Sequence, residues 1–131
     1  MRNKLFYFTT FLIIFFSACN NKIYQSNGET IYKTGRNVQG EKMLNKSASR
    51  IKIVNSCKSC HGKHGDAMRR VSIKFSYLEN AGNFSIPYND SLFFRFLDHD
   101  LKSDGEKANI GVTWKMSDQD KGDLLNYLKT L

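Results

Sequence analysis

The segment 56–66, SCKSCHGKHGD, contains two of the three cysteines of this 131-residue chain and a histidine directly after the second of them. Cys57 and Cys60 are separated by two residues, and His61 completes a C-x-x-C-H pattern. Thiols at this spacing can form a redox-active disulfide, bind zinc, or attach a haem covalently. The compartment of the protein and the elements around the segment distinguish between these three chemistries.

The N-terminus has the order of features that is typical of an export signal. Arg2 and Lys4 make the start basic, residues 5–16 are almost all apolar, and two small residues precede Cys19. The apolar run is shorter than the ~20 residues that a membrane-spanning helix needs. We therefore expect residues 1–19 to be a signal peptide and the rest of the chain to work outside the cytoplasm, under oxidising conditions.

The end of this signal, SAC at 17–19, resembles the lipobox of bacterial lipoproteins, although Phe16 stands where that family usually has leucine. The resemblance implies that Cys19 is lipidated and becomes the N-terminus, so that acyl chains tether the protein and no segment crosses the membrane. Asn20 follows the cysteine, and by analogy with bacterial sorting rules it favours the outer membrane. We expect a lipid-anchored protein of the bacterial cell envelope that faces the periplasm.

Haem attachment accounts for more of the C-x-x-C-H pattern than its two rivals. A redox pair needs a preceding strand and a βαβ pattern, which the flanking residues do not predict. Zinc could take Cys57, Cys60 and His64, but it lacks a clear fourth ligand because the adjacent Cys60 and His61 rarely chelate one ion. Two thiols on one turn can instead add to the two vinyl groups of a porphyrin, which places the next imidazole beneath the iron. We expect one covalent haem c per chain.

From residue 28 to residue 131 the chain resembles the class I c-type cytochromes. The stretch 56–66 is similar to the haem-binding stretch of that family, including the glycine after the histidine. The resemblance implies an all-α, cytochrome c-like domain of a few helices wrapped around one haem, with Cys57 and Cys60 as thioether partners and His61 as the proximal ligand. The end of the chain resembles the last helix of the family, whose aromatic residue, here Tyr127, packs across the first helix.

The distal iron ligand is the least determined part of the site. In the family it is usually a methionine in the last third of the chain. Met43 precedes the attachment site, and Met68 follows His61 too closely to reach the opposite face. We therefore expect Met116 to be the distal ligand, although no proline follows it and it could instead be a hydrophobic staple before the last helix. His99 is the rival ligand, and a vacant iron position is the third possibility.

Two helices are predicted by caps and apolar stripes. Ser117 is the expected N-cap of the last helix, in which Leu124, Leu128 and Leu131 share one face. Residues 89–105 predict a second helix, capped by Asp90 or Ser91 and ended by a glycine. Its expected apolar stripe consists of Leu92, Phe93, Phe96 and Leu97.

The other segments are less regular. We expect residues 20–27 to be a linker, residues 25–40 to be linker running into turns, residues 41–54 to form a helix or a pair of short strands, and residues 81–89 to be a loop. By the resemblance, a glycine and a second residue on the first helix meet the last helix. Gly28 with Tyr32 and Gly40 with Leu44 are both candidates for this pair.

The charge of the chain indicates an acidic partner. Loss of Arg2 and Lys4 with the signal lowers Lys plus Arg from 20 to 18 against 12 Asp plus Glu, which leaves a formal charge of +6. Nucleic acid is not an expected ligand of an exported lipoprotein. The basic residues around the motif indicate docking to an acidic face of a redox protein; they are Lys58, Lys63, Arg69, Arg70 and Lys74.

Three functions remain in competition at the level of the sequence. The first is a monohaem electron carrier of the cell envelope, which is not an enzyme. The second is a haem enzyme or small-ligand sensor with an open distal site. The third is a lipoprotein without haem that uses its thiols for redox chemistry or zinc.

Overall fold

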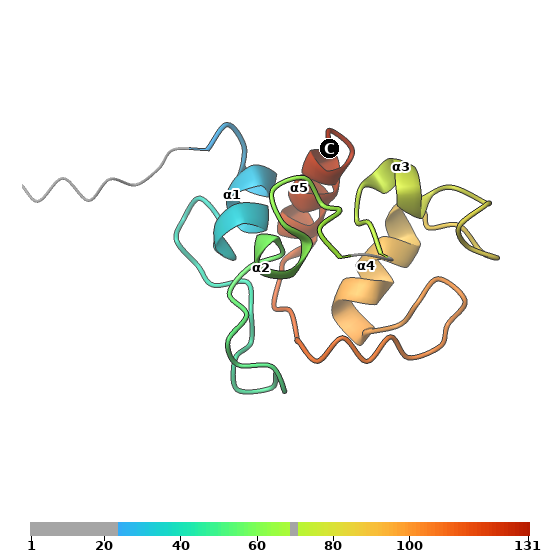
Figure 1. Ribbon diagram of the computed structural model, residues 1–131. Helices are drawn as coiled ribbons and strands as arrows, with labels where there is room; N and C mark the ends of the chain where they lie inside the picture. The colour runs from blue at the N-terminus through green and yellow to red at the C-terminus, as the bar shows by residue number, and fades with distance from the viewer. Residues whose placement is uncertain (1–23, 69–70) are drawn as a thin grey trace, which may run out of the picture.

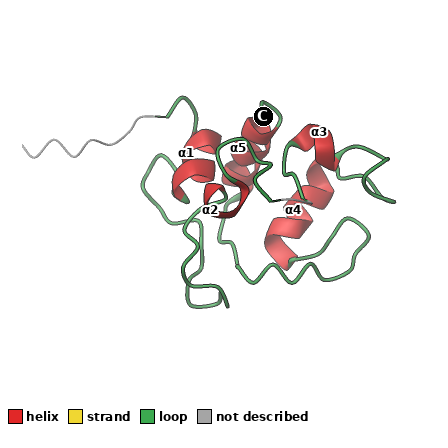
Figure 2. Ribbon diagram, in the orientation of Figure 1, coloured by secondary structure: helices red, strands yellow, loops and turns green. Residues whose placement is uncertain are grey.

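The structure is a computed structural model that describes residues 24–68 and 71–131. Residues 1–23, which include the expected signal and Cys19, lie outside the described residues, as do Arg69 and Arg70. The described chain is all-α and contains no strand, only isolated bridges between extended segments (Figures 1 and 2). Its helices are α1 (Asn27–Thr34), α2 (Lys58–His61), α3 (Phe75–Leu78), α4 (Asp90–His99) and α5 (Asp118–Leu128).

The packing of α1 against α5 joins the two ends of the domain (Figure 1). A Cβ atom on Gly28 would lie 1.9 Å from the carbonyl oxygen of Asp123, so the two backbones approach as only glycine allows. One turn further on, the rings of Tyr32 and Tyr127 lie with centroids 5.3 Å apart. This contact confirms that Tyr127 packs across the first helix, and it selects Gly28 and Tyr32 rather than Gly40 and Leu44.

The prediction of linker and turns for residues 25–40 was wrong, because α1 occupies the centre of this segment. Ser26 caps the helix by accepting a hydrogen bond from the Glu29 amide at 3.1 Å, and Gly35 ends it in a left-handed conformation with φ of 69°. Ile31 and Tyr32 are completely buried. The helix has only eight residues, which is too short for stability on its own, and its packing on α5 stabilises it.

Both of the longer helices lie where the sequence predicted them, but the two ends of α4 differ from the prediction. Ser117 caps α5 as expected, and its side chain accepts from the Asp120 amide. The cap of α4 is Asn89 rather than Asp90 or Ser91, and the helix ends at His99 instead of near Gly105. Asp100 takes the left-handed conformation that terminates α4, with φ of 55°. Asp tolerates this conformation better than most residues, which explains why the helix needs no glycine there.

The segment 41–54 is neither a helix nor a pair of strands, so both expectations for it were wrong. It forms turns and extended stretches whose backbone bonds to residues 35–37 on one side and to residues 111–115 on the other. The short helix α3 was not predicted, whereas residues 81–89 are irregular as expected. Among the described residues, no helix is long and apolar enough to cross a membrane.

The core lies between α1, α4 and α5 and extends to the buried thiol that precedes α2. Its most buried side chains come from α1 and α5, where Leu125 joins the predicted Leu124 and Leu128. Phe93 and Leu97 are the buried half of the α4 stripe, and Leu92 and Phe96 pack against the core from its edge.

Candidate functional site

The three residues of the C-x-x-C-H motif lie on one helical turn. Cys57 is the residue before α2, and its carbonyl oxygen accepts hydrogen bonds from the amides of Cys60 at 3.2 Å and His61 at 2.9 Å. Residues three and four positions apart share one face of such a turn. Cys57 is buried, Cys60 is exposed and His61 is half-buried, so the turn presents two thiols and an imidazole at the border between core and surface.

Both thiols are free in the structure, and the buried one, Cys57, is not a reactive thiolate. Burial raises the pKa of Cys57 to about 12, so the thiol stays protonated at neutral pH. Redox-active C-x-x-C pairs have a thiol whose pKa is lowered, because the thiolate is the nucleophile. No cluster of three or more His, Cys, Asp or Glu side chains suited to a metal ion occurs within the described residues, so the ligands of a zinc site are not assembled.

His61 is neutral at physiological pH because burial lowers the pKa of its imidazole. The neutral ring is the form that binds a metal. Its Nδ1 atom is buried and has no hydrogen-bond partner among the described residues. A buried polar atom without a partner is rare and calls for an explanation such as a missing ligand.

The first helix holds the motif at both of its ends. The Tyr32 hydroxyl donates a hydrogen bond of 2.8 Å to the carbonyl oxygen of Gly62, directly after His61. Before the motif, a Cβ atom on Gly35 would lie 1.8 Å from the carbonyl oxygen of Asn55. Gly35 therefore ends α1, and its lack of a side chain also allows the backbone at Asn55, just before the motif, to lie against it. Neither role of Gly35 was predicted. The second role depends on a contact between segments twenty residues apart, which the sequence does not reveal.

The turn after the motif is equally tight. Gly62 has φ of 71°, and a Cβ atom there would lie 2.7 Å from the Cβ of Ala67. The Ala67 amide donates back to the His61 carbonyl oxygen at 3.1 Å. Gly62 is thus required both because its φ is positive and because a side chain would clash with Ala67. The tight turn fixes the backbone of His61, which carries the imidazole.

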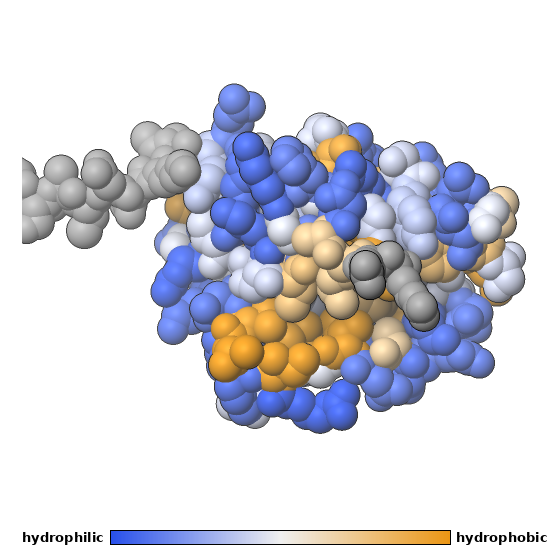
Figure 3. Space-filling model, in the orientation of Figure 1, coloured by the Kyte–Doolittle hydropathy of each residue, from blue (hydrophilic) through white to orange (hydrophobic). Residues whose placement is uncertain are grey.

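Apolar side chains gather on the face that carries α2 (Figure 3). In this view they lie below α2. The segments just before and just after the motif expose large apolar side chains: Ile51 is 40% exposed, Ile53 88%, Met68 47% and Val71 45%. Such exposure on one face marks a surface that another molecule or group covers.

The surroundings of the motif offer several of the features that a haem needs. A haem presents two apolar faces, an iron that takes imidazole, and two carboxylates that accept hydrogen bonds. The described residues offer exposed apolar side chains beside the motif and a neutral imidazole. Two further buried donors, Trp114 Nε1 and Arg95 Nε, have no partner among the described residues, although the Arg95 guanidinium also donates to the carbonyl oxygens of Lys102 and Ser103. The residues present therefore fit a haem. Trp114 was not singled out from the sequence, where a lone tryptophan has no distinguishing signal.

The candidate distal ligands lie on elements other than the motif turn. Met116 is half-buried, packs against the core and directly precedes the cap of α5. His99 is the exposed last residue of α4, and its carbonyl oxygen accepts from Lys107. Met43 is buried in the core, and Met68 is exposed close to the motif. His64, the third possible zinc ligand, is an exposed loop residue.

The basic residues near the motif are not equivalent. Lys58 and Lys63 are exposed, whereas Lys74 forms an ion pair with Asp66 at 2.8 Å. Arg69 and Arg70 lie outside the described residues. Lys58 and Lys63 are therefore the described cations of this cluster that are available to a partner.

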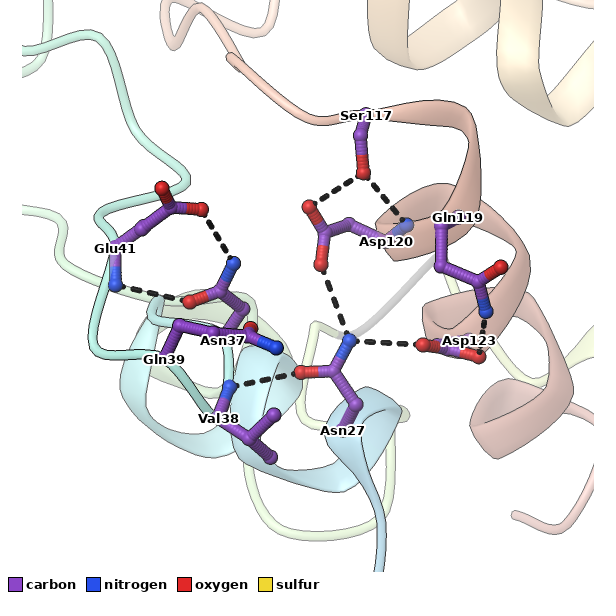
Figure 4. Close-up of a pocket in the computed structure, with 9 residues that line it drawn as sticks. All are labelled: Asn27, Asn37, Val38, Gln39, Glu41, Ser117, Gln119, Asp120 and Asp123. Carbon is purple, nitrogen blue, oxygen red and sulfur yellow. Dashed lines mark hydrogen bonds between the residues drawn. The ribbon is translucent and has the colours of Figure 1, made fainter.

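A polar pocket lies where the start of α5 meets α1 and the loop after it (Figure 4). Asn27 donates to Asp120 at 3.1 Å and to Asp123 at 2.8 Å, and Ser117 binds the other Asp120 oxygen at 2.7 Å. Burial alone would raise the pKa of Asp120, but the hydrogen bonds from Ser117 and Asn27 outweigh it and lower that pKa. The polar groups satisfy one another, so the pocket is a structural joint between α1 and α5.

Comparison with known proteins adds no relative to this description. No protein-family model matches the chain, and it matches neither a curated protein nor a solved structure.

Proposed function

We propose that this protein is a monohaem c-type cytochrome that carries single electrons in a bacterial cell envelope. The observation that carries the proposal is the C-x-x-C-H turn, on which two free thiols and a neutral, half-buried imidazole share one face. The apolar side chains exposed beside the turn support it, because a porphyrin would cover them.

In this proposal each residue of the site has a separate task. Cys57 and Cys60 hold the haem by thioether bonds, and His61 holds its iron. When bound, haem supplies an iron that alternates between the ferrous and ferric states. Tyr32 and Gly62 fix the backbone that carries the imidazole, and the apolar side chains before and after the motif exclude water from the cofactor, which tunes its potential.

Met116 is the proposed distal ligand, and an open iron site is the alternative. The position of Met116 directly before the cap of α5, packed against the core, also fits a hydrophobic staple, and this observation favours the alternative. In a ligated protein, Met116→Ala should abolish the weak near-infrared sulfur-to-iron band and open the ferrous iron to carbon monoxide. An unchanged spectrum would exclude Met116. His99→Ala would then test the rival ligand. If neither variant changed the near-infrared band or carbon monoxide binding, a haem enzyme or sensor would be favoured.

The partner proposed for this carrier is a redox protein with an acidic face, met at the membrane surface to which Cys19 is anchored. The exposed Lys58 and Lys63 flank the haem-binding turn and would increase the rate of encounter with such a face.

Covalent haem is the decisive test of the function. The protein is produced together with the haem-attachment machinery and extracted with acid–acetone, and we expect the haem to remain with the polypeptide and to give the haemochrome spectrum of a c-type haem. The double variant Cys57→Ala, Cys60→Ala should release it. Lys58→Ala changes an exposed residue of the same turn and should retain it. Complete extraction of haem from the wild type would refute the cytochrome proposal.

A further inference from the structure

Two segments far apart in the sequence, 43–51 and 109–115, are joined by a series of backbone hydrogen bonds. The Lys115 amide donates to the Met43 carbonyl oxygen at 2.7 Å, the Asn45 amide to Thr113 at 2.9 Å, and the Ile51 amide to Gly111 at 2.9 Å. A bridge between Leu44 and Trp114 lies within this series. We call residues 43–51 the strap and residues 109–116 the distal loop.

Ser49 is the one buried side-chain connection in this contact. It is 4% exposed, and its hydroxyl donates to the Asn45 carbonyl oxygen at 2.7 Å while accepting from the Thr113 amide at 2.9 Å. The hydroxyl therefore closes a turn of the strap and holds the distal loop at the same time. Without it, the Thr113 amide would lose its acceptor at a partly buried position, which is costly.

The distal loop is held at its other end too. Gly111 has φ of 80°, and a Cβ atom there would lie 3.0 Å from the Ile51 side chain. The Arg50 guanidinium donates to the carbonyl oxygen of Asn109 at 3.1 Å, and Asp100 at the end of α4 accepts from the Ile110 amide at 3.3 Å. The distal loop contains no helix or strand. It is held in place by its contacts with the strap and with the end of α4.

The two partners of this contact both lead to the candidate site. The strap runs directly into the segment that precedes Cys57, and the distal loop carries Met116 and the buried, unpartnered Trp114 Nε1. We infer that Ser49 is a positioning residue, which keeps the distal loop against the strap and thereby restricts access to the distal face of the haem. This inference rests on the proposed function, but it holds for an iron that is ligated by Met116 and for one that is open.

The test compares Ser49→Ala with Ser47→Ala in the haem-loaded protein. Ser47 is exposed, and its hydroxyl bonds the Asn45 side chain, so its removal leaves the distal loop untouched. In Ser49→Ala the amides of Thr113 and Lys115 should exchange with solvent roughly tenfold faster, as expected for one lost buried hydrogen bond. The ferrous protein should also combine with carbon monoxide several-fold faster than the wild type, and Ser47→Ala should match the wild type in both measurements.

Arg50→Ala provides a second variant in case Ser49→Ala does not fold. Arg50 is exposed, and its loss removes one contact to the distal loop, so the same changes are expected at smaller size. Wild-type carbon monoxide kinetics in the folded variants would overturn the inference even if amide exchange increased, because the contact would then be structural only. Absence of covalent haem in the wild type is a different result, which refutes the proposed function and the inference with it.

Discussion

At the scale of single residues, the most consequential contact is the hydrogen bond from Tyr32 to the Gly62 carbonyl oxygen. Tyr32 is completely buried on α1, and its ring also packs on Tyr127, so one side chain connects α1 and α5 to the turn after the C-x-x-C-H motif. The hydroxyl must stay protonated to donate this bond. Burial raises the pKa of Tyr32 well above the usual range, which keeps it protonated.

Tyr32→Phe should therefore lower the free energy of unfolding by about 1 kcal/mol at neutral pH, the net value of a typical buried hydrogen bond. The pKa is raised in the folded state, so the stability it contributes is complete below the unfolded value of about 10 and is lost as the pH rises above it. Denaturant titrations at pH 7 and pH 11 should show that the wild type loses its advantage over Tyr32→Phe at the higher pH.

Tyr24→Phe is the matched control for this effect, because Tyr24 lies at the start of the described chain with its ring beside Lys33, a contact that phenylalanine retains. It should leave stability unchanged at both pH values. A difference between wild type and Tyr32→Phe that is the same at pH 7 and pH 11 would contradict the assignment to the hydroxyl proton.

At the scale of elements, two glycines that look alike in the sequence have opposite roles. Both lie inside helices of the α1–α5 pair, where glycine is normally unfavourable relative to alanine. A Cβ on Gly28 would meet the Asp123 carbonyl oxygen at 1.9 Å and the Tyr127 Cβ at 2.9 Å. A Cβ on Gly122 would meet only the Phe94 ring, at an ordinary contact distance of 4.0 Å. Close packing thus requires the first glycine and not the second.

Gly28→Ala should destabilise the protein by about 3 kcal/mol, because α1 and α5 must move apart to admit the methyl group. Gly122→Ala should stabilise it by about 0.5–1 kcal/mol, the helix preference of alanine over glycine. Urea unfolding of the two variants and the wild type measures both values under one condition. Equal effects of the two substitutions would show that the close approach of α1 and α5 is not maintained in solution.

The same comparison explains which elements could be predicted from the sequence. α4 and α5 have several apolar residues on one face, and this local signal located both helices, although the end of α4 lies six residues before the predicted one. α1 has eight residues and two large buried side chains, so its stability comes from Gly28 fitting against α5. The strap forms no helix or strand, and its backbone hydrogen bonds to the distal loop join residues sixty or more positions apart.

The candidate site divides in the same way. Cys57, Cys60 and His61 could be found because their chemistry depends on spacing along the chain. Ser49, Trp114 and Gly35 could not, since their roles come from contacts between distant segments. Met116 stays a prediction, because a methionine before a helix cap has the same local pattern whether it binds iron or packs on the core.

At the scale of the whole molecule, the expected lipid anchor limits where the protein can act. Seven peptide bonds separate Cys19 from Ser26, the cap of α1, and they can span at most about 25 Å. A domain anchored at Cys19 would stay within that distance of the membrane surface. A redox partner of the proposed carrier would then be a membrane protein or a protein that approaches the same surface.

Cys19→Ser should abolish this attachment. The serine cannot form the thioether to the lipid, and each CH₂ group that is no longer buried in the bilayer removes ~0.8 kcal/mol of membrane affinity. In a bacterial host that processes lipoproteins, the wild type should incorporate labelled fatty acid and sediment with membranes, whereas Cys19→Ser should be unlabelled and uncleaved at this site. Ser17→Ala keeps a small residue beside the cysteine and should behave as the wild type. An unlabelled wild type that is nevertheless shortened and carries covalent haem would show that residues 1–19 contain an ordinary cleaved signal, and that the cytochrome moves freely to its partner.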